Sequence, residues 1–155
     1  MGTEIGAFAV RRSIWLDVGP ERVWREFEDL EHMRAWFGTG HTLVAYEPRV
    51  GGYVETSAGM TAGESLRFAG PVTHYEPGRE LSFEQDWLGR GWDAAPLITL
   101  RLTPAHGGTL VELFHHAFER TGDIAMAATN LRVFEEGWTM RQLEALRERV
   151  EGAAH

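Results

Sequence analysis

The stretch Asn130–Glu151, with the sequence NLRVFEEGWTMRQLEALRERVE, decides the fold. Its apolar residues recur every three or four positions, which predicts one long amphipathic helix. The predicted apolar face contains Val133, Gly137, Met140, Leu143, Leu146 and Val150, with Phe134 and Trp138 along its edge. A glycine inside a helix costs about 1 kcal/mol relative to alanine. We therefore expect another backbone or a ligand to approach Gly137 closely.

The chain before this helix has mostly strand-like patterns. Phe8–Val18 alternates in the manner of a strand, and a first short helix begins at Gly19-Pro20. A second short helix is predicted over Glu31–Phe37. The further predicted strands are Thr42–Glu47, Tyr53–Ser57, Glu64–Glu76, Arg79–Trp87, Pro96–Pro104 and Thr109–Phe118. Glu119–Thr129 is predicted to be a connection, in which Asp123 could cap an earlier helix start.

These elements together predict an α+β architecture. Consecutive strands that are joined by short turns must be antiparallel. One face of such a sheet is apolar, and the C-terminal helix is the only element long enough to cover it. We therefore expect a curved antiparallel sheet of six to seven strands around a long helix, enclosing a space that the two short helices close at one end. Gly70-Pro71 inside a strand indicates a bulge or a sheet edge, and an exposed edge there would permit a dimer.

Composition excludes several classes of function. The chain has 155 residues, which suits a single domain, 1–155, with an ordered core of about 8–151 and loose ends at Met1–Ile5 and Gly152–His155. It has no cysteine and no lysine, so disulfides, thiol nucleophiles and lysine Schiff bases are excluded. The net charge of −8 argues against nucleic acid and anionic membranes as partners. No apolar run is long enough to span a membrane, and the N-terminus does not resemble a signal peptide. We therefore expect a cytoplasmic protein.

Six short motifs resemble those of one superfamily. They are GPERVW at Gly19–Trp24, WF at Trp36–Phe37, EPRVGG at Glu47–Gly52, the spacing of Gly70, Pro77 and Leu81, the spacing of Gly108, Thr109 and His115, and EGW at Glu136–Trp138 followed by Leu143 and Leu146. In this order they resemble the START-like (SRPBCC, helix-grip) superfamily. The match is nearest to the branch similar to the C-terminal domain of the heat-shock-protein-90 ATPase activator.

The resemblance implies a helix-grip fold with an internal cavity between the sheet and the long helix. It does not imply one chemistry, because members of the superfamily include ligand carriers, lipid binders, polyketide cyclases, resistance proteins and co-chaperone domains. These members share no catalytic set.

His115 is the best single candidate for chemistry. It shares strand parity with Val111 and Leu113, which turns it toward the helix and any cavity. There it could bind a ligand oxygen or act as an acid or base, although a core histidine bonded to its neighbours is the plainer interpretation. Adjacent strand residues point to opposite faces, so His115 and His116 cannot chelate one metal ion, and we expect neither a metal nor a cofactor. Glu84 and Asp86 are expected on the solvent face, and no nucleophile or dinucleotide motif is present.

Aromatic residues supply the rest of the predicted site. The predicted ligand-binding residues are His115, Gln85, Trp87, Phe83, Leu100, Phe134, Trp138 and Met140, with Phe83 serving mainly as core. Arg12, which shares parity with buried positions, would need a polar partner or an exit to water. We predict binding of a small apolar or aromatic molecule by a monomer or homodimer. The alternatives are a cyclase or hydrolase that uses His115, and a protein-interaction module that resembles the co-chaperone domain.

Overall fold

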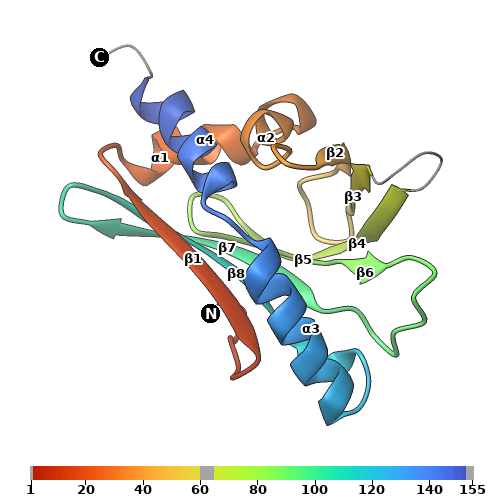
Figure 1. Ribbon diagram of the computed structural model, residues 1–155. Coiled ribbons are helices and arrows are strands. Elements are labelled where there is room, and N and C mark those ends of the chain that lie inside the picture. The colour runs from red at the N-terminus through yellow and green to blue at the C-terminus, as the bar shows by residue number, and fades with distance from the viewer. Residues whose placement is uncertain (1, 60–64, 153–155) are drawn as a thin grey trace.

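The computed structural model describes residues 2–59 and 65–152 and shows a curved antiparallel sheet with helices against its concave side (Figure 1). The strands are β1 (Ala9–Leu16), β2 (Thr42–Tyr46), β3 (Tyr53–Gly59), β4 (Ser65–Glu76), β5 (Glu80–Glu84), β6 (Asp86–Trp87), β7 (Leu97–Ala105) and β8 (Gly108–His116). They follow the order β1-β8-β7-β5-β4-β3-β2, and β6 pairs with β4 off this path. The predicted helix-grip fold class is confirmed. The predicted strand start at Glu64 lies outside the described residues.

Two short helices follow β1, as predicted. They are α1 (Pro20–Trp24), which continues into the 3₁₀ turn η1 (Arg25–Phe27), and α2 (Leu30–Trp36). Proline in the first turn suits α1, because its missing N–H would have no partner there. The side chain of Asp29 caps α2 by accepting a hydrogen bond from the backbone N–H of His32.

The C-terminal segment is two helices, so the prediction of one helix over Asn130–Glu151 is wrong. After the 3₁₀ turn η2 (Phe118–Arg120), α3 (Ile124–Gly137) begins at the side-chain cap of Asp123, and α4 (Arg141–Glu151) follows a bend. Trp138 leaves the helical conformation, with φ −78° and ψ 129°. Figure 1 shows α4 beside α1 and α2, whereas α3 lies toward the other end of the sheet. As a result Val133 and Gly137, which were predicted to face the core, are exposed.

Arg12 on β1 holds this bend in place. Its guanidinium donates to the backbone carbonyl oxygens of Glu135 and Trp138, at 2.7 Å and 3.1 Å, and forms an ion pair with the Glu135 carboxylate. The last carbonyls of a helix lack partners within the helix, so an arginine here satisfies groups that would otherwise need water. The polar partner that the position of Arg12 required is therefore the C-terminal end of α3.

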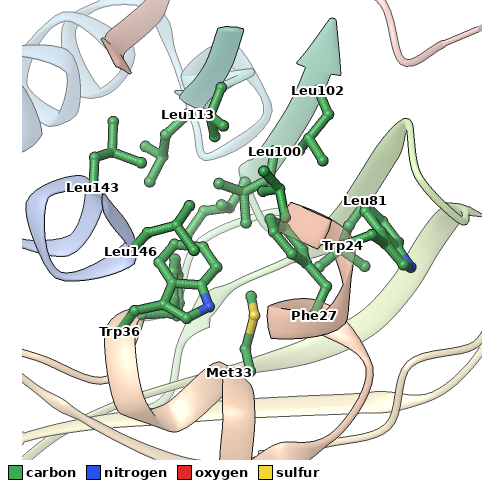
Figure 2. Close-up of a cluster of buried hydrophobic side chains, with 14 of the residues drawn as sticks. Trp24, Phe27, Met33, Trp36, Leu81, Leu100, Leu102, Leu113, Leu143 and Leu146 are labelled. Atoms are coloured by element: carbon green, nitrogen blue, oxygen red, sulfur yellow. The ribbon is translucent and has the colours of Figure 1, made fainter. Parts of the chain in front are cut away.

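The main hydrophobic core lies under α1, α2 and α4. Figure 2 shows Trp24, Phe27, Met33 and Trp36 of the short helical segments meeting Leu143 and Leu146 of α4 and leucines of the sheet. A smaller cluster of Val10, Phe118 and Ala127 lies under α3. Trp138 packs against both clusters, so the bend in the C-terminal segment joins the two.

The predicted strand Arg79–Trp87 is interrupted at Gln85. β5 pairs with the end of β4 and with β7, whereas β6 pairs with an earlier part of β4. A Cβ on Gly70 would lie 2.4 Å from the Glu84 carbonyl oxygen, so only glycine allows β4 to approach this closely. A register shift between Val72 and His74 confirms the predicted bulge. Gly70-Pro71 is not at a sheet edge, because β4 lies between β3 on one side and β5 and β6 on the other.

The convex face of the sheet carries a buried chain of polar groups. The Ser82 hydroxyl lies 2.7 Å from the Thr3 hydroxyl and 2.8 Å from the Thr99 hydroxyl. The Thr99 hydroxyl in turn lies 2.8 Å from Nε2 of His116. The backbone N–H of Thr3 also donates to the Glu80 carboxylate, so this residue is held against the sheet rather than loose. Met1 and residues 153–155, which were also expected to be loose, lie outside the described residues. No helix in the described part of the chain is long and apolar enough to cross a membrane.

Candidate functional site

A cavity of about 210 Å³ lies between the sheet and the bend of the C-terminal segment. Its walls come from distant parts of the chain, which the fold brings together. They are His41, Thr56, Ala58, Leu66, Phe68, Gln85, Ile98, His115, Phe134, Gly137, Trp138 and Gln142. Most of these side chains are apolar or aromatic, and none of them is an aspartate, glutamate or arginine.

Two irregular points of the fold lie at this wall, namely the bend between α3 and α4 and the interruption between β5 and β6. The bend between α3 and α4 places Trp138 over the sheet, between Phe134 of α3 and Gln142 of α4. Gln85 stands at the interruption between β5 and β6 and is buried, with 2% of its surface exposed. The strand parity that Gln85 shares with the buried Phe83 already predicts its inward face, whereas the position of Trp138 depends on the bend.

His115 on β8 is tied to Trp138. The indole Nε1–H of Trp138 donates to Nδ1 of His115 at 3.0 Å. Because Nδ1 accepts, the proton of the neutral imidazole is on Nε2. The ring lies among Phe118 and Phe134, with centroids 4.7 Å and 4.4 Å away. Nε2 is buried and has no hydrogen-bond partner among the described residues.

Burial lowers the pKa of His115 to about 3, with a smaller contribution from the neighbouring His116. The imidazole is therefore neutral at physiological pH. An acid or base that works near neutrality needs a pKa near 7. This environment suits a hydrogen-bonding role for His115 better than proton transfer.

The wall contains two glutamines with different hydrogen bonding. Gln85 is satisfied internally, because its Oε1 accepts from the Thr56 hydroxyl and its Nε2 donates to the carbonyls of Val54 and Glu84. Gln142 donates from Nε2 to the carbonyl of Thr39 at 3.1 Å. Its Oε1 is buried without a partner among the described residues.

His41 completes the polar part of the wall. It lies in the loop before β2, with the rings of Phe37 and Trp138 edge-on to it at 5.9 Å and 6.4 Å. Burial lowers the pKa of His41 below its ordinary value, so this imidazole is also neutral at pH 7. A neutral imidazole offers one donor and one acceptor.

The structure brings half of the predicted ligand-binding residues to the cavity. His115, Gln85, Phe134 and Trp138 line it. The remaining four lie elsewhere: Phe83 and Leu100 are fully buried in the main core, Met140 packs against that core, and Trp87 packs against Phe68, Trp92 and Arg90.

Sequence reasoning missed the other residues of the wall. Gln142 follows Trp138 by four positions, a helical spacing that could have indicated a shared face. His41 lies in a loop, where no periodic pattern reports which way a side chain points. His115 and His116 do face opposite sides of the sheet, since one contacts Trp138 and the other Thr99. Within the described ranges no three residues that could ligate a metal ion come together.

Comparison with known proteins identifies the fold and the family. Residues 17–151 match the family model described as activator of Hsp90 ATPase homolog 1-like protein. No curated protein matches the chain. A crystal structure of a protein from Chromobacterium violaceum is similar, with a TM-score of 0.68 and 21% identity over 92% of this chain and 96% of that one.

Two solution structures also have folds similar to that of this chain. A protein from Arthrobacter aurescens has a TM-score of 0.71 and 19% identity over 99% of this chain and 92% of that chain. The Aha1 dimer from Colwellia psychrerythraea has a TM-score of 0.58 and 18% identity over 94% of this chain and 98% of that chain. At these identities the likeness shows the fold.

Proposed function

The chain belongs to the family of activator of Hsp90 ATPase homolog 1-like proteins, and from this premise we propose that it binds a small apolar or aromatic molecule in the cavity beside Trp138. Binding would sequester or carry the molecule, with no bond made or broken. The helix-grip architecture supports the proposal, because it separates the packed core under α4 from a second region under the bend.

The observation that carries the proposal is the cavity itself. A cavity of about 150 Å³ with an apolar wall can hold benzene, so the space of about 210 Å³ here suits a somewhat larger molecule, such as a bicyclic aromatic. Aromatic side chains of Phe68, Phe134 and Trp138 offer ring faces and edges for contact. Pockets of this kind, with a few polar anchors in an apolar wall, are typical of small-molecule sites.

The two alternatives have less support. The low pKa of His115 leaves it unable to exchange a proton easily near neutral pH, which disfavours a cyclase or hydrolase that depends on it. An interaction module would be expected to have an exposed apolar patch and a filled interior. Val50, Tyr53 and Leu88 are exposed apolar side chains, yet the interior contains the cavity described above.

The test is a binding measurement on the full chain with indole, 2-naphthol and 1-octanol. A compound present at a hundredfold its dissociation constant should raise the free energy of unfolding by about 2.7 kcal/mol. For a domain of this size, that corresponds to an increase in Tm of roughly 5–10 °C. Calorimetric titration should give one site per chain.

A matched pair of variants locates the binding site. Ala58→Phe places a ring in the cavity wall and should abolish the Tm increase, because the added ring takes the ligand's volume. Ala125→Phe makes the same change at an exposed position of α3 and should leave the increase intact. Equal Tm increases in both variants, or no increase with any compound in the wild-type chain, would contradict the proposal.

A further inference from the structure

We propose that two copies of this chain exchange their N-terminal arms, so that the arm of each copy docks on the sheet of the other. The arm is the segment 2–7, which is anchored to the convex face of the sheet. It docks on a polar seat that consists of Glu80, Ser82, Thr99, Arg101 and His116. The partner is a second copy of this chain, and the contacts between the copies are those that the arm makes within one chain.

Thr3 anchors the arm through all of its polar groups. Its backbone N–H donates to the Glu80 carboxylate at 2.5 Å, and its carbonyl oxygen accepts from Nη2 of Arg101 at 2.7 Å. Its hydroxyl lies 2.7 Å from the Ser82 hydroxyl. Two of these bonds involve charged side chains, which makes them stronger than bonds between neutral groups. One residue therefore carries a compact set of contacts that the arm of a second copy can reproduce.

The seat belongs to the sheet, which positions its side chains. Glu80 of β5 stands opposite Arg101 of β7, and Ser82 stands opposite Thr99. Nε of Arg101 donates to the Glu80 carboxylate at 2.7 Å, and Glu80 is only 3% exposed. A buried ion pair is stable only when further hydrogen bonds satisfy its remaining positions. The seat therefore favours an occupied state, whichever copy supplies the arm.

The connection between the arm and β1 suits a hinge. Glu4, Gly6 and Ala7 are exposed, and residues 2–8 form neither a helix nor a strand. The N–H of Ala9 donates to the carbonyl oxygen of Ala7 at 3.1 Å, which closes a tight turn of three residues. Opening this turn leads the arm away from its own seat. Because exchange of an identical segment reuses the contacts of the closed form, it leads to a dimer at little cost in free energy.

Disulfide trapping tests the exchange, since the chain has no cysteine of its own. Two full-length variants, one with Thr3→Cys and one with Ser82→Cys, are mixed over a range of concentrations and oxidised gently. The two hydroxyls that are replaced lie 2.7 Å apart, so the sulfurs of exchanged copies can form a bond. We expect a linked pair of unlike chains whose yield rises with concentration.

Two controls accompany the trapping. A chain that carries both substitutions should form the disulfide within itself at low concentration, because the arm docks on its own seat. Thr3→Cys mixed with Ala125→Cys measures linkage by random collision, since Ala125 is exposed on α3. Ser82 is fully buried, so collision favours the control. Exchange should nevertheless give roughly tenfold more linkage to Ser82→Cys at high concentration, because docking holds the two sulfurs together.

Sedimentation of the wild-type chain gives a readout that no substitution disturbs. We expect a dimer fraction that rises with concentration. Gly2→Val should abolish the dimer, because a Cβ at position 2 would lie 2.6 Å from Oε1 of Glu80 and would prevent docking of the arm. Gly6→Val is the matched control in the same arm. Its Cβ would lie 3.7 Å from the nearest atom, an oxygen of Glu119, so the dimer should persist.

Each step of the proposal has an outcome that contradicts it. A wild-type chain that stays monomeric at every concentration would overturn the exchange, as would linkage to Ser82→Cys no greater than linkage to Ala125→Cys. A dimer that survives in Gly2→Val would overturn the role of the arm. Failure of the doubly substituted chain to form an internal disulfide would overturn the docking of the arm on its seat. None of these outcomes depends on whether a molecule binds in the cavity.

Discussion

At the scale of single residues, the hydrogen bond between Trp138 and His115 connects the bend to the sheet. It satisfies the indole N–H and one imidazole nitrogen in a region with few other polar groups. It also fixes which tautomer His115 adopts, with the proton on Nε2. One side-chain contact therefore links the bend of the C-terminal segment to the sheet and sets the tautomer of a buried histidine.

Trp138→Phe should lower the free energy of unfolding by about 1–3 kcal/mol, because Nδ1 of His115 becomes a buried acceptor without a partner. Urea denaturation at pH 7 measures the change. The same substitution in a His115→Leu background should cost less, since no acceptor is then left unpaired. An equal cost in both backgrounds would show that ring packing, and not the hydrogen bond, makes the contribution.

At the scale of elements, the bend between α3 and α4 decides which residues form the cavity. Gly137 ends α3, and a Cβ at this position would meet nothing within 4 Å. Of the two expectations for Gly137, the approach of another backbone is therefore wrong. The approach of a ligand stays a prediction, because the residue lines the cavity. Arg12 holds the carbonyls of Glu135 and Trp138 at the end of α3, so the bend does not depend on the absence of a side chain at Gly137.

Gly137→Ala should accordingly raise the free energy of unfolding by roughly 0.5–1 kcal/mol, because alanine loses less backbone freedom and fits the available space. Thermal and urea denaturation should agree on the sign. Gly70→Ala is the control for a glycine that cannot be replaced, since its Cβ would lie 2.4 Å from the Glu84 carbonyl oxygen. Destabilisation by both substitutions would mean that the bend itself requires glycine.

At the scale of the whole molecule, buried histidines link stability to pH. Burial lowers the pKa of His115 to about 3 and that of His116 to about 4, whereas an unfolded histidine titrates near about 6.5. The unfolded chain therefore binds more protons than the folded chain between these values. The stabilisation that the two neutral histidines contribute is complete above about pH 6.5. It is lost as the pH falls through their pKa values in the folded chain.

The free energy of unfolding should thus decrease as the pH falls from about 6.5 to about 5, with a slope approaching about 1.4 kcal/mol per pH unit for each histidine. Glu26 and Glu80, whose pKa values are also lowered, add a loss of the same sign only below their ordinary range. The raised pKa of His32, which pairs with Asp29, acts in the opposite direction. His41, whose pKa burial also lowers, adds a loss of the same sign. In His115→Leu the slope measured by urea titrations should therefore fall by the share of one histidine, up to about 1.4 kcal/mol per pH unit. An unchanged slope would show that His115 does not contribute.

The sequence by itself determined the class of the fold and the order of the two short helices and the main strands. Alternation along the strands, the proline at the start of α1 and the cap at Asp123 are local signals, and each reports the conformation of its own segment. Parity also placed His115 on the inner face and His116 on the outer face, as the structure confirms. These predictions succeed because the physical cause of each lies within a few neighbouring residues.

Only the tertiary structure decided where the C-terminal segment bends and which residues the cavity contains. The apolar spacing continues across Gly137 and Trp138, so the sequence resembles one helix. The break is fixed by the bonds of Trp138 to His115 and Arg12, and these residues lie far away along the chain. His41 and Gln142 reach the wall for the same reason. A cavity is space that non-local packing leaves unfilled, so no pattern within one segment can specify its wall.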